Sequence, residues 1–157
     1  MKTAIILSIC FLTMGTNDSC LIEGKGFKGY VFDKEHFVLL SIENQAERYT
    51  PSKEDVFLVE KLISSNLEKI NFPLVNQGGD CPVIHKSLRK YVRQYVGFIN
   101  KNGEKIIWVN FIWNDKTMKD KASKDIVSIL DGCSHFWKIN VNLTKEELFD
   151  LKINGSS

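Results

Sequence analysis

Two long apolar runs separated by one short polar turn constrain the fold of this chain more than any other feature. The runs occupy residues 91–100 and 105–113, and the turn between them contains Asn102-Gly103. An Asn-Gly pair between two such runs is a strong hairpin signal, because both residues tolerate the positive φ that a tight turn requires. We therefore expect two adjacent antiparallel strands here.

Alternation of apolar and polar residues returns near the C-terminus. One face of residues 135–143 holds a row of large side chains: His135, Trp137, Ile139, Val141 and Leu143. The alternation repeats over 149–153, whereas 116–124 looks like a charged loop. This period is typical of a sheet with one buried face and one solvent-facing face. Short apolar runs at 30–32 and 37–40 add a strand pair or a bent strand.

One segment has the repeat of an amphipathic helix. Its apolar residues recur every three or four positions: Val56, Val59, Ile63, Leu67 and Ile70. Ser52 and Asp55 form a capping-box pattern at its start, and Asn71-Phe72-Pro73 ends it. The sequence therefore predicts an α+β domain with one main helix packed on a four- to six-stranded antiparallel meander sheet. This layout is similar to that of cystatins.

Residues 1–19 have the layout of a secretory signal peptide. Lys2 supplies a positive charge, and residues 3–14 are uncharged and mostly apolar. That run is too short to span a bilayer. We expect export of the chain, with residues 20–29 forming a glycine-rich tether and residues 30–157 forming a single α+β domain.

Cys20 stands where the acylated cysteine of a bacterial lipoprotein would stand. Ser19 before it is small, but Asn17 and Asp18 fit a lipobox poorly. Two forms of the mature protein stay open, a lipoprotein anchored through Cys20 and a soluble secreted form. The lipoprotein would lie in the periplasm or at the outer membrane.

The formal charge of +2 demands no polyanionic partner. Basic and aromatic residues do gather in one segment: Lys86, Arg89, Lys90, Tyr91, Arg93 and Tyr95. We interpret them as a solvated strand edge and expect no nucleic acid partner.

Several segments resemble a family of small exported proteins from anaerobic Gram-negative bacteria that are described as lipoproteins. The similar segments are 48–55, 91–99, the turn at Asp131-Gly132 and the closing hairpin 141–155. The resemblance covers most of the chain after residue 40. It implies export, and it implies no active site, because the function of that family is unknown.

Four residues could take part in chemistry: Cys81, His85, Cys133 and His135. They could form a Cys₂His₂ metal site, although their spacing differs from that of zinc fingers. A Cys81–Cys133 disulfide is favoured over that site because export exposes thiols to oxidation, and two buried free thiols are the remaining alternative. Cys133 and His135 lie two residues apart, so a hydrolase-type enzyme using both is an alternative function.

Two motif matches lack the context they need. Residues 24–29 read GxGxxG, but no strand is expected before them and no helix after them, so we expect no bound cofactor. Residues 94–97 are one residue short of the QxVxG loop of cystatin-type protease inhibitors, and they fall within a predicted strand instead of at a turn.

The sequence favours an exported binding module over an enzyme. Its partner would be a protein or a glycan, since the chain contains more aromatic residues than one face of a small sheet needs: Tyr95, Trp108, Phe111, Trp113 and Trp137. Aromatic side chains are common at contact sites because each one buries a large area. For most of these residues, however, packing in the core is the favoured interpretation.

Overall fold

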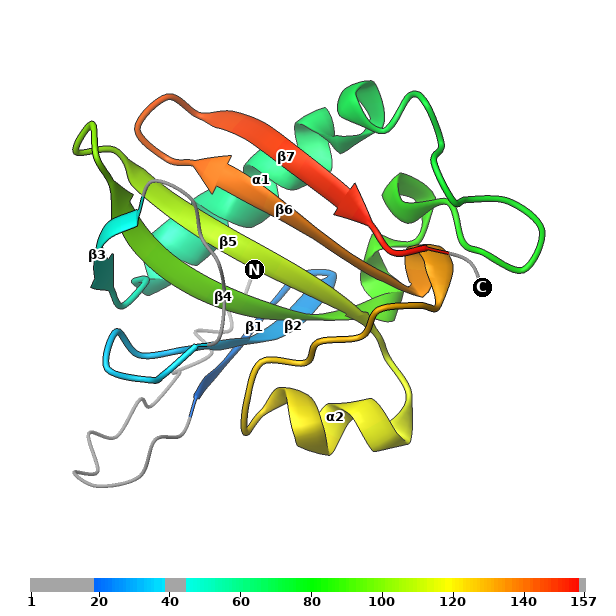
Figure 1. The fold of residues 1–157 in the computed structure, drawn as a ribbon, viewed down its shortest axis with the longest axis horizontal. Helices are drawn as coiled ribbons and strands as arrows, with labels where there is room; N and C mark the ends of the chain where they lie inside the picture. Colours follow the sequence, from blue (N-terminus) through cyan, green and yellow to red (C-terminus); the bar gives the residue numbers. More distant parts are fainter. Residues whose placement is uncertain (1–18, 39–44, 156–157) are drawn as a thin grey trace, which may run out of the picture.

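The predicted hairpin forms the middle of the sheet, as β4 (Tyr91–Asn100) and β5 (Lys105–Trp113) (Figure 1). The computed structural model describes residues 19–38 and 45–155. In the turn, Gly103 has a φ of 77°. The side chain of Asn100 accepts hydrogen bonds from the backbone N–H groups of Asn102 and Glu104, so the turn is closed by its own residues.

Within the described residues, seven strands make up the sheet, in the order β1-β2-β4-β5-β6-β7, and β3 pairs with β4. The remaining strands are β1 (Cys20–Gly24), β2 (Phe27–Val31), β3 (Gln45–Tyr49), β6 (Phe136–Asn142) and β7 (Glu147–Ile153). Every pair is antiparallel except β2 with β4, which is parallel. The α+β class is as predicted, and β4 to β7 form an antiparallel meander. The predicted four to six strands match the sheet only roughly, because it has one more strand and this parallel pair.

Residues 20–29, expected to form a tether, instead form the β1–β2 hairpin. Gly26 makes its turn with a φ of 88°. Gly29 lies opposite Arg93 in the parallel pair, where a Cβ would come within 2.6 Å of the Tyr95 ring. The glycines of this segment therefore allow a tight turn and close packing of β2 on β4.

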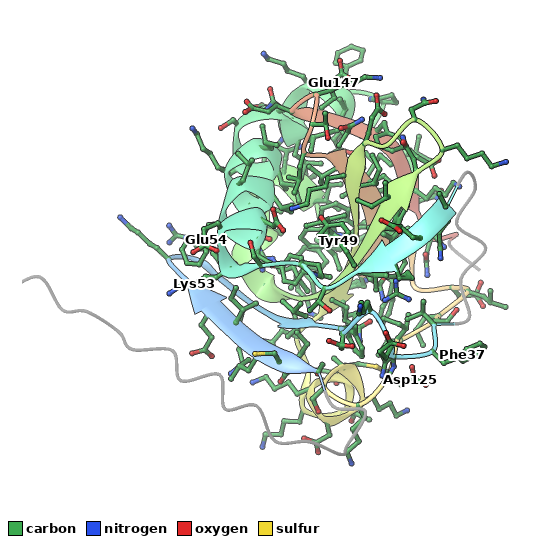
Figure 2. All side chains as sticks on the ribbon, turned by 90° about the vertical axis from the view of Figure 1, so that its left-hand side faces the viewer. Phe37, Tyr49, Lys53, Glu54, Asp125 and Glu147 are labelled. Carbon is green, nitrogen blue, oxygen red and sulfur yellow. A yellow bond between two sulfur atoms is a disulfide. The ribbon has the colours of Figure 1, made fainter. Side chains whose placement is uncertain are left out.

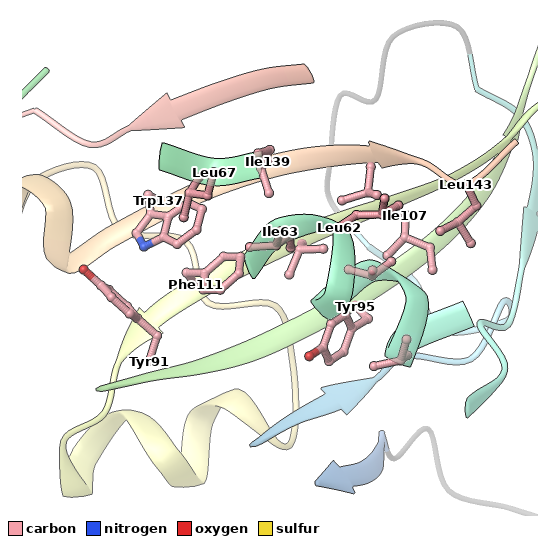
Figure 3. Close-up of a cluster of buried hydrophobic side chains, with 14 of the residues drawn as sticks. Leu62, Ile63, Leu67, Tyr91, Tyr95, Ile107, Phe111, Trp137, Ile139 and Leu143 are labelled. Atoms are coloured by element: carbon pink, nitrogen blue, oxygen red, sulfur yellow. The ribbon is translucent and has the colours of Figure 1, made fainter. Parts of the chain in front are cut away.

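Helix α1 (Lys53–Ile70) covers one face of the sheet, with the predicted capping box between Ser52 and Asp55. Four of the five stripe residues are buried, and Ile70 at the helix end is exposed. Figure 3 shows Ile63 and Leu67 beside Phe111 and Trp137 of the sheet. Figure 2 places Tyr49 of β3 in the same interior.

The second face of the central strands is also covered, which corrects the prediction of a solvent-facing side. Helix α2 (Lys116–Ala122) lies there, and Ala122 is fully buried against Val92 and Ile112. Asp115 caps α2 by accepting a hydrogen bond from Met118 N, so a segment predicted as a loop is helical. Strands β4 and β5 are buried on both faces over most of their length.

Three 3₁₀ turns connect these elements: η1 (Ile84–Lys86), η2 (Leu88–Lys90) and η3 (Cys133–His135). A register shift between β6 and β7, with Asp150 at a φ of 54°, leaves Phe149 exposed, whereas Leu151 and Ile153 face the core.

None of the described helices has the length and apolar character to span a bilayer. The leader up to residue 18 and positions 39 and 40 lie outside the described residues.

Candidate functional site

A disulfide joins two loops at one end of the molecule. Cys81 and Cys133 are 52 residues apart in sequence, and their sulfur atoms are 2.09 Å apart. Cys81 belongs to the loop 71–83 between α1 and η1, and Cys133 belongs to the loop 129–135 that leads through η3 into β6. This is the pairing that the sequence favoured.

The residues after β7 hold the same two loops together. Asn76 donates a hydrogen bond from Nδ2 to Asn154 O at 2.8 Å. Asn154 donates from its own Nδ2 to Ile129 O and to Asp131 O. Loop 71–83, loop 129–135 and the chain end therefore meet at Asn154, on the right-hand side of Figure 1.

Five large apolar side chains are exposed on these loops. They are Phe72, Leu74, Val75, Ile129 and Leu130, which we call the apolar loop surface. Phe72 and Leu130 are 85% and 87% exposed. Single exposed apolar residues are ordinary, but several on loops that are fixed against each other are typical of a contact surface.

The backbone of these loops adopts unfavourable conformations. Leu74, Asn76 and Cys133 have φ values of 50°, 53° and 45°, in the left-handed region that side chains disfavour. Such residues cost about 1–3 kcal/mol each and persist only where surrounding contacts fix them. The disulfide and the Asn154 hydrogen bonds are those contacts, so the apolar loop surface has a defined shape.

His85, a candidate metal ligand, instead helps to fix the end of α1. Asn71 is buried, and its Nδ2 lies 3.0 Å from His85 Nδ1 and 2.9 Å from Gln77 Oε1. Gln77 donates back to Asn71 Oδ1 at 2.7 Å and accepts from Ile84 N. The side-chain network sets the course of loop 71–83 from inside the fold.

Cys133 and His135 are neighbours, as the enzyme alternative requires. Cys133 Sγ lies 3.5 Å from His135 Nδ1, and the imidazole packs edge-on against Trp113. In the disulfide, however, this sulfur carries no thiolate to act as a nucleophile. Over residues 19–38 and 45–155, no three His, Cys, Asp or Glu side chains gather in a way that could hold a metal ion.

Arg93, predicted to lie on a solvated strand edge, is buried between β4 and α1. Its Nε and Nη2 donate to the two carboxylate oxygens of Glu60, each at 3.3 Å, and its Nη1 donates to Tyr91 O. Tyr95 donates its hydroxyl to Glu60 at 2.8 Å. Burial raises the pKa of Tyr95, and the Glu60 carboxylate raises it further, so the tyrosine stays a donor. These groups join the helix to the sheet.

The rest of the predicted basic-aromatic cluster is not a strand edge. Tyr91 and Tyr95 are buried, whereas Lys86, Arg89 and Lys90 are exposed on η1 and η2. Strand β4 begins only at Tyr91, so the basic residues precede the strand instead of bordering it.

Gln94, the first residue of the cystatin-like match, is fully buried with four partners. Its Nε2 donates to Ala122 O and Asp125 O, and its Oε1 accepts from Asn110 Nδ2 and Val127 N. The residue thus fixes the chain after α2 on the sheet. Residues 94–97 are not at a hairpin tip.

The aromatic residues considered for a contact surface lie in the interior, where most of them were expected to pack. Tyr95, Phe111, Trp108 and Trp137 are buried, and Trp113 is partly buried. Phe111 stacks on Trp137 with ring centroids 3.7 Å apart. A sheet covered on both faces uses these rings for packing.

Sequence reasoning did not identify the apolar loop surface. A signal was present, because Phe72-Pro73-Leu74-Val75 is apolar yet follows a helix end and precedes Gly78-Gly79. No family model, curated protein or solved structure matches this chain.

Proposed function

We propose that this protein is an exported binding module whose apolar loop surface contacts another protein. The observation behind the proposal is the end of the molecule that contains the Cys81–Cys133 disulfide. Two loops that present five exposed apolar side chains are linked by a disulfide and by the hydrogen bonds of Asn154. A surface fixed before binding loses little conformational entropy when a partner covers it.

A protein suits this surface better than a glycan does. Four of its five exposed side chains are aliphatic, and the single aromatic one is Phe72. Sugars present a large number of hydroxyl groups, and burying those against aliphatic side chains would leave them without hydrogen bonds. A partner protein with an apolar patch of its own has no such cost.

Export is the second part of the proposal. The leader-like residues 1–19 favour it, and so does the resemblance to small exported proteins. The disulfide is compatible with an oxidising compartment. We place the mature protein in the periplasm or at the outer membrane as a lipoprotein acylated on Cys20, with secretion as the alternative. The likeness to cystatins is one of architecture, because buried Gln94 cannot contact a protease.

Cross-linking in living cells tests the contact surface. A photoreactive amino acid placed at position 72 or 130 should yield the same cross-linked partner. The matched control is position 37, because Phe37 is also highly exposed, at 78%, but lies elsewhere on the molecule (Figure 2). Cross-links that form equally from position 37 would contradict the assigned surface.

Substitution then measures the contribution of the surface to affinity. Replacing Phe72 and Leu130 together with serine should weaken binding of the cross-linked partner at least about tenfold, since exposed apolar anchors contribute most at interface centres. Stability should change by less than about 1 kcal/mol, because both side chains are already exposed. An unchanged Kd in calorimetry with the purified partner would show that another surface binds.

A further inference from the structure

A second surface of the molecule is strongly basic. Helix α2 and the residue pair after it present four exposed lysines: Lys116, Lys119, Lys121 and Lys124. Within the described part of the chain, none of the four forms an ion pair, whereas Lys105, Lys145 and Lys152 each contact a carboxylate. The charge on α2 is therefore available to something outside the fold.

Arg89 and Lys90 of η2 extend this surface. Asn114, just before α2, donates its backbone N–H to Lys90 O at 3.0 Å. Lys90 Nζ lies 5.8 Å from the ring centroid of Trp113, and a Cβ at Gly26 would lie 3.2 Å from Arg89 Nε. We call Arg89, Lys90 and the four α2 lysines the basic face.

The acidic residues beside the basic face are outnumbered. Along residues 115–125 they are Asp115, Asp120 and Asp125. Asp115 caps α2, and Asp125 accepts hydrogen bonds from Ile126 N and from His36. Six cations against three carboxylates leave a formal excess of three positive charges, although the whole chain carries only +2. The remainder of the protein is close to neutral.

The chain enters the fold beside this face. In the unprocessed chain, Ser19 donates its hydroxyl to Ser123 O, directly after α2, which locates the neighbouring Cys20 near the end of this helix. Strand β1 begins at the next residue, Cys20, with no spacer between it and the sheet. Both ribbon views place β1 next to α2 (Figures 1 and 2). An acyl group on Cys20 would therefore hold α2 close to the bilayer.

We infer that the basic face rests on an anionic phospholipid bilayer when Cys20 is acylated. Each lysine near an anionic surface adds to the attraction, and a basic cluster combined with acyl chains is a common two-part attachment. The inference rests on the proposed export and acylation, but not on the apolar loop surface. Loop 71–83 projects from another side of the molecule than α2, so it stays accessible to a partner (Figure 1).

A lipid surface fits the basic face better than RNA or single-stranded DNA does. Those ligands bind grooves in which bases stack on aromatic side chains. The aromatic residue beside the basic face, Trp113, is partly buried and is already in contact with Lys90 and His135. What remains is a convex helix surface with cations and no platform for a base.

Vesicle sedimentation tests the inference separately from the acyl chains. The protein used is the chain from position 20 onward with Cys20→Ser, which retains every described strand and helix. It should bind vesicles of phosphatidylglycerol and phosphatidylcholine at low salt, but not vesicles of phosphatidylcholine alone. Binding should fall as salt is added, because exposed charges are screened.

Two triple variants of equal charge give the matched comparison. Changing Lys119, Lys121 and Lys124 to glutamine should lower the partition coefficient for the anionic vesicles at least about tenfold. Lys61, Lys69 and Lys101 are exposed on other parts of the molecule, and the same change there should leave binding within about twofold.

Three results would overturn the inference: equal binding to neutral vesicles, equal loss in the two triple variants, or an RNA oligonucleotide that binds the basic face more tightly than the vesicles do. None of them affects the proposed contact surface, since the Phe72 and Leu130 variant tests that surface with the partner protein. Conversely, loss of partner binding in that variant leaves vesicle binding unchanged.

Discussion

Replacing Ile63 with aspartate should unfold the domain. Ile63 lies in the middle of α1, is fully buried and packs in the same core as Phe111 (Figure 3). An unpaired carboxylate at this place costs several kcal/mol, comparable with the roughly 5–15 kcal/mol that stabilises a whole domain. Circular dichroism should show no cooperative melt.

The matched control is Ser65→Asp, which adds the same charge to the exposed side of the same helix. Its stability should stay within about 0.5 kcal/mol of the original protein. If the Ile63→Asp protein melted cooperatively at nearly the original temperature, α1 would not be the cover of the sheet.

Removing the disulfide should have the second-largest effect. With Cys81 and Cys133 both changed to serine, a constraint between positions 52 residues apart disappears from the unfolded chain. The chain-entropy relation gives a loss of about 4 kcal/mol for a loop of this length. In a domain of this size the melting temperature should fall by about 10 °C or more. Urea titration measures the change in free energy.

Cys20→Ser is the control, because it removes a thiol that is not part of the disulfide. Its urea midpoint should match that of the original protein. The double serine variant should also bind the partner protein more weakly, since loops 71–83 and 129–135 lose their link. A double variant as stable as the Cys20→Ser protein would mean that the loops are held without the disulfide.

The strongest elements of the fold were predictable because their signals are local. The β4–β5 hairpin has both its strands and its turn residues in one stretch of 23 residues, 91–113, and α1 has its cap and its stripe within 52–70. Each segment specifies its own conformation by turn chemistry, capping and apolar period. Tertiary packing therefore has little influence on the conformation of such segments.

Elements that depend on distant partners were not predictable in the same way. The glycine-rich residues 20–29 read as a tether until β2 is seen to pair with β4, more than 60 residues later. Helix α2 is short and charged, and a single buried residue, Ala122, faces the sheet. Because tertiary pairing decides such weak segments, propensity alone misassigns them.

The candidate site also has one part that the sequence predicted and other parts that it did not. The pairing of Cys81 with Cys133 followed from the number of cysteines and the expected compartment. Core packing of most aromatic residues was expected, but the covered second face was not, because composition cannot tell whether a sheet is covered on one face or on both. The exposure of Phe72 and Leu130 depends on how their loops cross the surface, which no local pattern encodes.

The most direct test of the account as a whole is the intact mass of the protein purified from its native cells, without reduction and after alkylation of free thiols. The account predicts a chain that begins at Cys20, with Cys81 and Cys133 unalkylated because they are joined to each other. The mass of acyl chains on Cys20 would identify the lipoprotein form, whereas a Cys20 that carries no more than the alkylating group would identify the secreted form. A chain that still begins at Met1, with alkylated Cys81 and Cys133, would contradict both the export and the disulfide on which the contact surface depends.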